Sequence, residues 1–240
     1  MGLLRPPRDA LGATRVTALN QYGSRPTEQR YLRETKREPL NGLALIFAQN
    51  TLSYDVTFRR RELRAKRRTL TPFKQAAHTS AVSQHLFNSA LVSGGYLAAY
   101  AAIDGELDLW SFIARHPRIA LPVVESTKHM SFRAYRFGDR LKINRFGIPE
   151  PIDGRRVDAM KLSAVLTPLV GFDDNGTRIG MGGGYYDLHF ARRRRPLLIG
   201  VGHALQHVKH IPQREKDVPL DAVVTESGWY YFSRRAEKLK

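Results

Sequence analysis

The sequence predicts an α/β protein whose mainly parallel β-sheet is covered by helices on both faces. From about residue 57 to the C-terminus, apolar runs of strand length alternate with segments of helical pattern, and this alternation is typical of a parallel sheet. One run, AVLTPLVGF (164–172), is apolar almost throughout, as a strand buried on both faces would be. With 240 residues, 42% of them hydrophobic, the chain can bury a sizeable core.

The individual elements follow from local signals. The first helix is strongly basic, and in the second Thr71 is a suitable N-cap before Pro72 at the first helical position. We expect helices at 60–69, 70–87, 108–116 and 185–193. The first strand begins with a pair of glycines, and the third alternates polar and apolar residues. We expect strands at 94–102, 118–124, 131–137, 164–172, 196–202, 221–225 and 229–232.

The N-terminal segment differs from the rest of the chain. Residues 1–56 have scattered Arg, Pro, Gly and Asn without a sustained period, and only 42–47 is apolar enough to pack. We expect 1–56 to be a disordered basic extension or the product of a misplaced start codon. Residues 57–240 should form a single catalytic domain.

Charge and composition narrow the class of protein. The net charge is +17, with clusters at 59–68 and 192–195, so the chain should attract polyanions such as nucleotides or nucleic acid, unless these clusters are only solvated helix faces. There is no cysteine, which excludes disulfides and thiolate metal sites and is consistent with a cytoplasmic protein. No apolar run is long enough to span a membrane, and no signal-peptide pattern is present.

The segment GTRIGMGGGYYD (176–187) has five glycines in twelve residues, between a buried strand and a helix. This layout is typical of a loop that binds phosphate, although it matches neither a Walker A loop nor a dinucleotide fingerprint. Arg178 could bind phosphate, and Asp187 could hold Mg²⁺ beside it. Each of these features also has a purely structural explanation. The loop could be a tight strand-to-helix crossover, and Asp187 could only offset the positive end of the helix dipole. Tyr185 and Tyr186 could be core residues.

Several segments together resemble the 5-formyltetrahydrofolate cyclo-ligase family, most closely its bacterial branch. The most specific is TPLVGFDDNGTRIGMGGGYYD (167–187). Others follow in the family's order, namely RRRELRAKRRTLTP (59–72), YAAIDGELDLWSFI (100–113), LKINRFGIPEP (141–151) and VPLDAVVT (218–225). The resemblance covers roughly 57–232.

The resemblance implies a fold, a reaction and partners. The fold would be a three-layer, Rossmann-like sandwich of the isomerase and CoA-transferase type. The reaction would convert 5-formyltetrahydrofolate, with ATP and Mg²⁺, to 5,10-methenyltetrahydrofolate, ADP and phosphate. This chemistry needs positioning and charge neutralisation rather than a protein nucleophile, so no catalytic side chain is assigned.

The resemblance also implies site residues. Arg60 and Arg178 would contact ATP, and Glu106 would bind the N–H edge of the folate pterin. Asp187 and Asp221 would hold Mg²⁺, although Asp221 could instead begin a strand and Glu106 could begin a helix. The loop residues implied for ATP are Gly180, Met181, Gly182, Gly183, Gly184, Tyr185 and Tyr186, of which Gly183, Gly184 and Tyr185 would also contact folate.

This chain departs from the family pattern at three positions. Val56 and Gly183 stand where relatives have lysines, and Leu188 where an arginine is frequent, so fewer cations are available for ATP. Two other classes of protein remain as alternatives. One is a basic nucleic-acid-binding protein, and the other is a different α/β enzyme, such as a sugar-phosphate isomerase or a CoA transferase.

Overall fold

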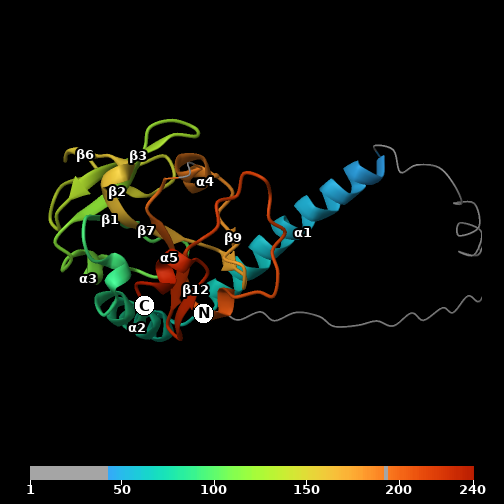
Figure 1. Ribbon diagram of the computed structural model, residues 1–240, viewed down its shortest axis with the longest axis horizontal. Coiled ribbons are helices and arrows are strands. Elements are labelled where there is room, and N and C mark those ends of the chain that lie inside the picture. Colours follow the sequence, from blue (N-terminus) through green and yellow to red (C-terminus); the bar gives the residue numbers. More distant parts are fainter. Residues whose placement is uncertain (1–42, 192–193) are drawn as a thin grey trace, which may run out of the picture. The chain divides into compact units, whose positions relative to one another are not determined.

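The core of the protein is a mixed β-sheet with a parallel centre (Figure 1). The computed structural model describes residues 43–191 and 194–240, with side chains from Val56 onward. The strand order is β12-β11-β10-β7-β1-β2-β3-β6. The parallel strands are β1 (Tyr96–Ala98), β2 (Ile119–Val124), β7 (Leu162–Pro168), β10 (Leu197–Val201) and β11 (Ala222–Thr225). The antiparallel strands are β3 (Met130–Tyr135), β6 (Arg156–Val157) and β12 (Gly228–Tyr231).

The strand order reverses between β1 and β7. From β1 the chain proceeds to β2 on one side, whereas β7 pairs with the other side of β1 and is followed outward by β10 and β11. Open parallel sheets bind ligands beyond the carboxyl ends of the strands at such a switch point. The segments that leave β1 and β7 there are 99–109 and 169–184, which contain Glu106 and the glycine loop.

Helices cover both faces of the sheet, which confirms the predicted three layers (Figure 1). On one face, α2 (Pro72–Phe87) and α3 (Trp110–Ile113) pack through Leu86 and Phe112 against Leu97. On the other, α4 (Tyr185–Phe190) packs Phe190 into a second apolar cluster with Ala98. Leu97 and Ala98 lie in different clusters because successive strand residues point to opposite faces.

Helix α1 (Leu43–Arg68) is longer than the expected helix at 60–69. Residues 43–56, which the sequence placed in a disordered extension, form its first part, and residues 1–42 lie outside the described part of the chain. Near the helix end, Leu63 packs against Val170 and Ile179. Gly171 allows this contact, because a Cβ atom there would lie 2.6 Å from Leu63 Cδ1.

The expected strand at 164–172 is divided in two. After β7 the chain enters a hairpin of β8 (Gly171–Phe172) and β9 (Arg178–Ile179), in which Val170 N donates to Ile179 O at 2.7 Å. The glycine loop therefore begins at the end of a hairpin and not directly at the sheet. The remaining elements are β4 (Leu141–Ile143), β5 (Pro149–Pro151), η2 (Ala90–Val92), η3 (Ala159–Lys161), η4 (Ala204–Gln206) and α5 (Arg234–Glu237).

One further helix agrees with expectation at its start, and another differs in length. The N-cap of α2 is as predicted, with the Thr71 side chain accepting a hydrogen bond from Lys74 N. The expected helix at 108–116, in contrast, is a single turn at α3.

No described helix combines the length and the apolar character that a membrane crossing needs.

Candidate functional site

The glycine loop lies open to solvent at the switch-point edge of the sheet. Gly182 and Gly184 have φ of 105° and 67°, which side chains other than glycine rarely adopt. Gly180 has no such φ, and a Cβ atom there would meet nothing within 4 Å. Neither backbone conformation nor packing among the described residues therefore requires glycine at 180. The missing side chain leaves the backbone accessible, as a loop that contacts a ligand needs.

Arg60 of α1 contacts this loop directly. Its Nε donates to Gly180 O at 2.8 Å, and its Cζ would lie 3.9 Å from a Cβ atom on Gly182. Burial, and then the charges of Arg214 and Arg64, lower the pKa of the Arg60 guanidinium. In the part of the chain that the structure describes, its Nη atoms have no protein partner. The half-buried guanidinium is thus fixed at one nitrogen and free to bind an anion with the others.

Arg214 was not recognised in the sequence. It lies in the loop between η4 and β11, and its charge acts on Arg60. No local motif marks it, because it reaches the site only through the fold. Val56, where this chain supplies no cation, packs against the apolar cluster that contains Leu63.

Arg178 and Asp187 form an ion pair at the other end of the loop. Arg178 Nη2 donates to Asp187 Oδ1 at 2.7 Å, and its Nη1 donates to the carbonyl of Val218. Val218 N donates to the same Oδ1 atom at 3.0 Å. Asp187 Oδ2 has no partner within the described residues. Arg178 therefore orients this carboxylate and leaves one of its oxygens available.

The two tyrosines differ in surroundings. Tyr185 accepts a hydrogen bond from Arg145 Nη2 at 3.2 Å and packs edge-on against Phe146. Burial, and then the charge of Glu106, raise the pKa of Tyr186. Tyr186 is therefore close enough to Glu106 to link the glycine loop with the segment after β1. Met181 is exposed.

Glu106 is a half-buried carboxyl in the segment that leaves β1. Its Oε2 accepts a hydrogen bond from Ile103 N at 3.1 Å. Burial raises its pKa from 4.5 to about 7, although Ile103 N and Arg67 favour the charged form. The side chain is thus poorly solvated without a ligand, which is typical of a carboxyl in a functional site.

Replacing Glu106 by glutamine should stabilise the protein increasingly as the pH rises. The pKa of Glu106 is about 7 in the folded protein, above the ordinary value of 4.5. Between these two pH values the folded protein retains a proton that the unfolded chain loses, so the stability of the wild type falls as the pH rises. Glutamine abolishes the loss, and the variant should gain about 1–3 kcal/mol over wild type between about pH 5 and pH 8. Urea unfolding at both pH values measures it, with Glu237→Gln at an exposed site as control. A difference that does not change with pH would contradict the pKa.

An ionic cluster next to Glu106, of which Arg67 is the buried member, was missed in the sequence. Asp104 has φ of 54° and accepts hydrogen bonds from Arg64 Nε at 2.8 Å, Arg67 Nη2 at 2.9 Å and Arg68 Nε at 2.5 Å. Burial opposes ionisation of Asp104, but these arginines outweigh it and lower its pKa to about 2. Arg67, with no exposed surface, also donates to Asp104 O and Leu169 O. The cluster therefore fixes α1 to the segment that carries Glu106.

Asp221 is placed differently from the other predicted residues. It is 1% exposed at the amino end of β11, opposite the strand ends where the loop lies. Its Oδ2 accepts from Arg195 Nη1 at 2.5 Å, Arg235 Nη2 at 2.7 Å and Leu198 N at 2.8 Å, and its Oδ1 from Arg235 Nε at 2.7 Å. A carboxylate offers about four acceptor positions. The geometry thus favours the structural alternative over a metal ligand.

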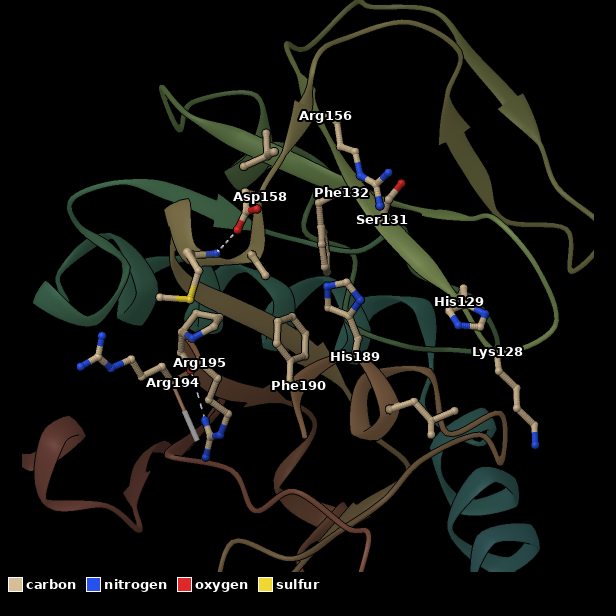
Figure 2. Close-up of a pocket in the computed structure, with 15 residues that line it drawn as sticks. Lys128, His129, Ser131, Phe132, Arg156, Asp158, His189, Phe190, Arg194 and Arg195 are labelled. Atoms are coloured by element: carbon tan, nitrogen blue, oxygen red, sulfur yellow. Dashed lines mark hydrogen bonds between the residues drawn. The ribbon is translucent and has the colours of Figure 1, made fainter. Parts of the chain in front are cut away.

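A cavity of about 560 Å³ lies elsewhere, between β3, β6 and α4 (Figure 2). Four of its fifteen lining residues are Lys or Arg, and none of the predicted site residues belongs to it. Figure 2 shows Lys128, Arg156, Arg194 and Arg195 around it. Pro196 precedes β10 and Met160 precedes β7, so the cavity lies toward the amino ends of these strands. We therefore place the candidate site at the glycine loop and not in this cavity.

The parallel sheet, with an arginine-supported glycine loop at its switch point, defines an α/β enzyme domain of the anion-binding, open-sheet class. A model of the 5-formyltetrahydrofolate cyclo-ligase family matches residues 55–226. The chain therefore belongs to the 5-formyltetrahydrofolate cyclo-ligase family.

Individual relatives agree with this assignment. The chain is 36% identical over 176 residues to the 5-formyltetrahydrofolate cyclo-ligase of Escherichia coli K12, covering 69% of this chain and 97% of the relative. Identity to the Haemophilus influenzae protein of the same name is 34% over 174 residues, covering 67% and 92%. The NMR structure of 5,10-methenyltetrahydrofolate synthetase from Aquifex aeolicus superimposes with a TM-score of 0.66 at 28% identity, covering 74% of this chain and 92% of the other.

Proposed function

We propose that this protein closes 5-formyltetrahydrofolate to 5,10-methenyltetrahydrofolate, using ATP and Mg²⁺ and releasing ADP and phosphate. The observation that carries the proposal is the hydrogen bond from Arg60 to Gly180, which joins a cation to the open glycine loop at the switch point. In the proposed reaction the γ-phosphoryl group of ATP is transferred to the formyl oxygen. N10 then attacks the formyl carbon and gives up its proton to solvent, and the C–O bond breaks as phosphate leaves.

The cations near the loop would bind the ATP phosphates. Arg60 has free Nη atoms, and Arg214 and Arg64 contribute positive charge beside it. Phosphoryl transfer depends on positioning and charge stabilisation more than on covalent chemistry by the protein. The open backbone at Gly180 and Gly182 would allow the phosphates to approach closely.

Asp187 fits a magnesium site, because Mg²⁺ is usually bound by one or two carboxylates together with the substrate phosphates. Its Oδ2 is available within the described residues, while Oδ1 is held by Arg178 and Val218. When bound, Mg²⁺ would neutralise charge that develops on the transferred phosphoryl group. Asp221 has no such free oxygen position.

Glu106 would accept hydrogen bonds from the pterin N–H groups of the folate. Donors that reach this poorly solvated carboxyl favour its charged form, so the ligand would supply the stabilisation that the protein alone does not. The charge of Glu106 acts on Tyr186, so Tyr186 would keep the segment that carries Glu106 next to the glycine loop. Tyr185 would form a wall of the same region with Phe146.

The direct test is an assay of the purified full chain on 5-formyltetrahydrofolate with and without ATP, read by the absorbance of methenyltetrahydrofolate. Product should form only with both ATP and Mg²⁺. Absence of product from folded protein under these conditions would overturn the proposal.

The nucleic-acid alternative is weakened by how α1 uses its positive charges. Arg59 and Lys66 form ion pairs with Glu62. Arg60 donates a hydrogen bond to the glycine loop. The arginines at 64, 67 and 68 form ion pairs with Asp104. Among the cations at 59–68, Arg61 alone has no protein partner that the described structure shows. Arg59, Lys66 and Arg68 remain exposed, so the argument rests on Arg60, Arg64 and Arg67, which bind groups of the protein where a helix for a nucleic-acid backbone would present them to solvent.

Replacing Arg60 by alanine should raise the KM for ATP by about ten- to a hundredfold, because a hydrogen bond to a charged group contributes about 1.5–3 kcal/mol. Arg61→Ala is the control, since Arg61 is an exposed neighbour on the same helix. Steady-state kinetics with varied ATP measures both. Equal, small effects of the two substitutions, with RNA binding that falls steeply with salt, would favour the nucleic-acid class instead.

A further inference from the structure

A second cluster of potential metal ligands lies outside the magnesium and nucleotide site. It consists of His78 on α2, His203 after β10, and Glu226 in the turn between β11 and β12. One ligand atom from each lies within 4.8 Å of the others. His78 Nδ1 is 2.9 Å from His203 Nδ1 and 3.4 Å from Glu226 Oε1. Three donors from three separate segments therefore converge on one point.

The geometry points to a binding site for a divalent transition metal of the zinc type at His78, His203 and Glu226. Zinc bound tetrahedrally by imidazole, at about 2.0–2.1 Å, places two ligand nitrogens about 3.3 Å apart. The 3.4 Å between His78 Nδ1 and Glu226 Oε1 is close to this value. The 2.9 Å between His78 Nδ1 and His203 Nδ1 is a hydrogen bond, and a bound metal would replace its proton. Two imidazoles and one carboxylate are a donor set that zinc accepts, with a fourth position left for water.

The protonation of His203 suits this role. Its Nε2 lies 3.2 Å from Gly105 O, and because a carbonyl only accepts, Nε2 must carry the hydrogen. The neutral ring then presents the lone pair of Nδ1 to the cluster. A histidine whose second nitrogen donates to a carbonyl is the usual arrangement of a metal ligand.

The other groups around the cluster are fixed by the backbone. Ala204 N donates to Glu226 Oε2 at 2.9 Å, which leaves Oε1 for the metal. His203 N donates to Gln206 Oε1 at 2.7 Å, and the amide of Gln206 is held by Leu169 O at 2.8 Å. These bonds hold both ligands in place without a metal, so binding would require little rearrangement.

The positive charge that acts on the cluster from the core is already paired. Arg67 disfavours added positive charge at His203, but it forms an ion pair with Asp104 at 2.9 Å. Glu226 contributes a negative charge at the cluster itself. The site also contacts the segment before Glu106, because His203 binds Gly105 O. A metal there would restrain that segment from the α2 side.

The test is zinc binding by the untagged full chain after chelation and dialysis, with bound metal measured by elemental analysis and the melting temperature recorded with and without Zn²⁺. We expect one zinc per chain and a melting temperature raised by several degrees. His78→Gln and Glu226→Gln should each weaken zinc binding at least about tenfold. Both side chains are half-buried, so these variants should fold more readily than a change at buried His203.

His207→Gln is the matched control, because His207 forms a comparable pair with Asp174, at 2.7 Å, without a third ligand. It should bind zinc as the wild type does. Tetrahedral Co²⁺, which absorbs visible light, gives a second readout that is independent of catalysis. The inference is overturned if the wild type binds no zinc, or if His78→Gln and Glu226→Gln bind it as tightly as His207→Gln.

Discussion

Replacing Asp104 by asparagine should lower the free energy of unfolding by about 3–5 kcal/mol, the usual cost of removing one partner from a buried ion pair. Asparagine keeps the shape and tolerates the left-handed backbone conformation with φ of 54°. The substitution therefore removes charge without adding backbone strain. Arg67, which has no exposed surface, would lose its only anionic partner in the described structure.

The matched control is Asp153→Asn. Asp153 pairs with Arg140 at 2.8 Å, but both side chains are exposed, and such a pair contributes less than about 1 kcal/mol. Denaturant unfolding of both variants at neutral pH makes the comparison. Equal stability of the two variants would show that the Asp104 cluster does not hold α1 to the segment before Glu106.

The Asp104 cluster also shows where sequence reasoning ends. Arg64 and Arg67 belong to the segment that the sequence predicted as a strongly basic helix. Their shared partner lies about 40 residues away along the chain, and it occupies a backbone conformation that is uncommon for aspartate. Neither fact has a local sequence signal. A run of arginines therefore indicated charge, but not that most of this charge is paired within the protein.

The parallel sheet and the glycine loop could be predicted because their signals are local. The buried strand is visible as an apolar run, and the loop as glycines between that strand and a helix. The hairpin of β8 and β9 was missed, since its strands are two residues each and too short for a periodic pattern. The cluster of His78, His203 and Glu226 was missed for a different reason, because its members are distant along the chain and meet only through the fold.

The two aspartates that the resemblance links to magnesium should respond differently to asparagine. Asp221→Asn should destabilise the protein by about 3–5 kcal/mol, because Arg195 and Arg235 both donate to this buried carboxylate. Burial opposes its ionisation, but hydrogen bonds from Arg235, Leu198 N and Arg195 lower its pKa. The carboxylate is therefore charged and paired in the folded protein, and asparagine would leave two guanidinium groups without their anion.

Asp187→Asn should leave the fold intact and reduce activity by about ten- to a hundredfold, the effect of losing one charged contact of about 1.5–3 kcal/mol. The amide oxygen can still accept from Val218 N and Arg178, so the loop keeps its anchor, whereas the charge that would hold Mg²⁺ is lost. Denaturant unfolding and the magnesium dependence of the cyclisation assay, measured on both variants, separate the two roles. An Asp221→Asn protein with wild-type stability and weakened magnesium dependence would make Asp221 a metal ligand after all. An Asp187→Asn protein with unchanged activity would leave Asp187 only the role of orienting Arg178.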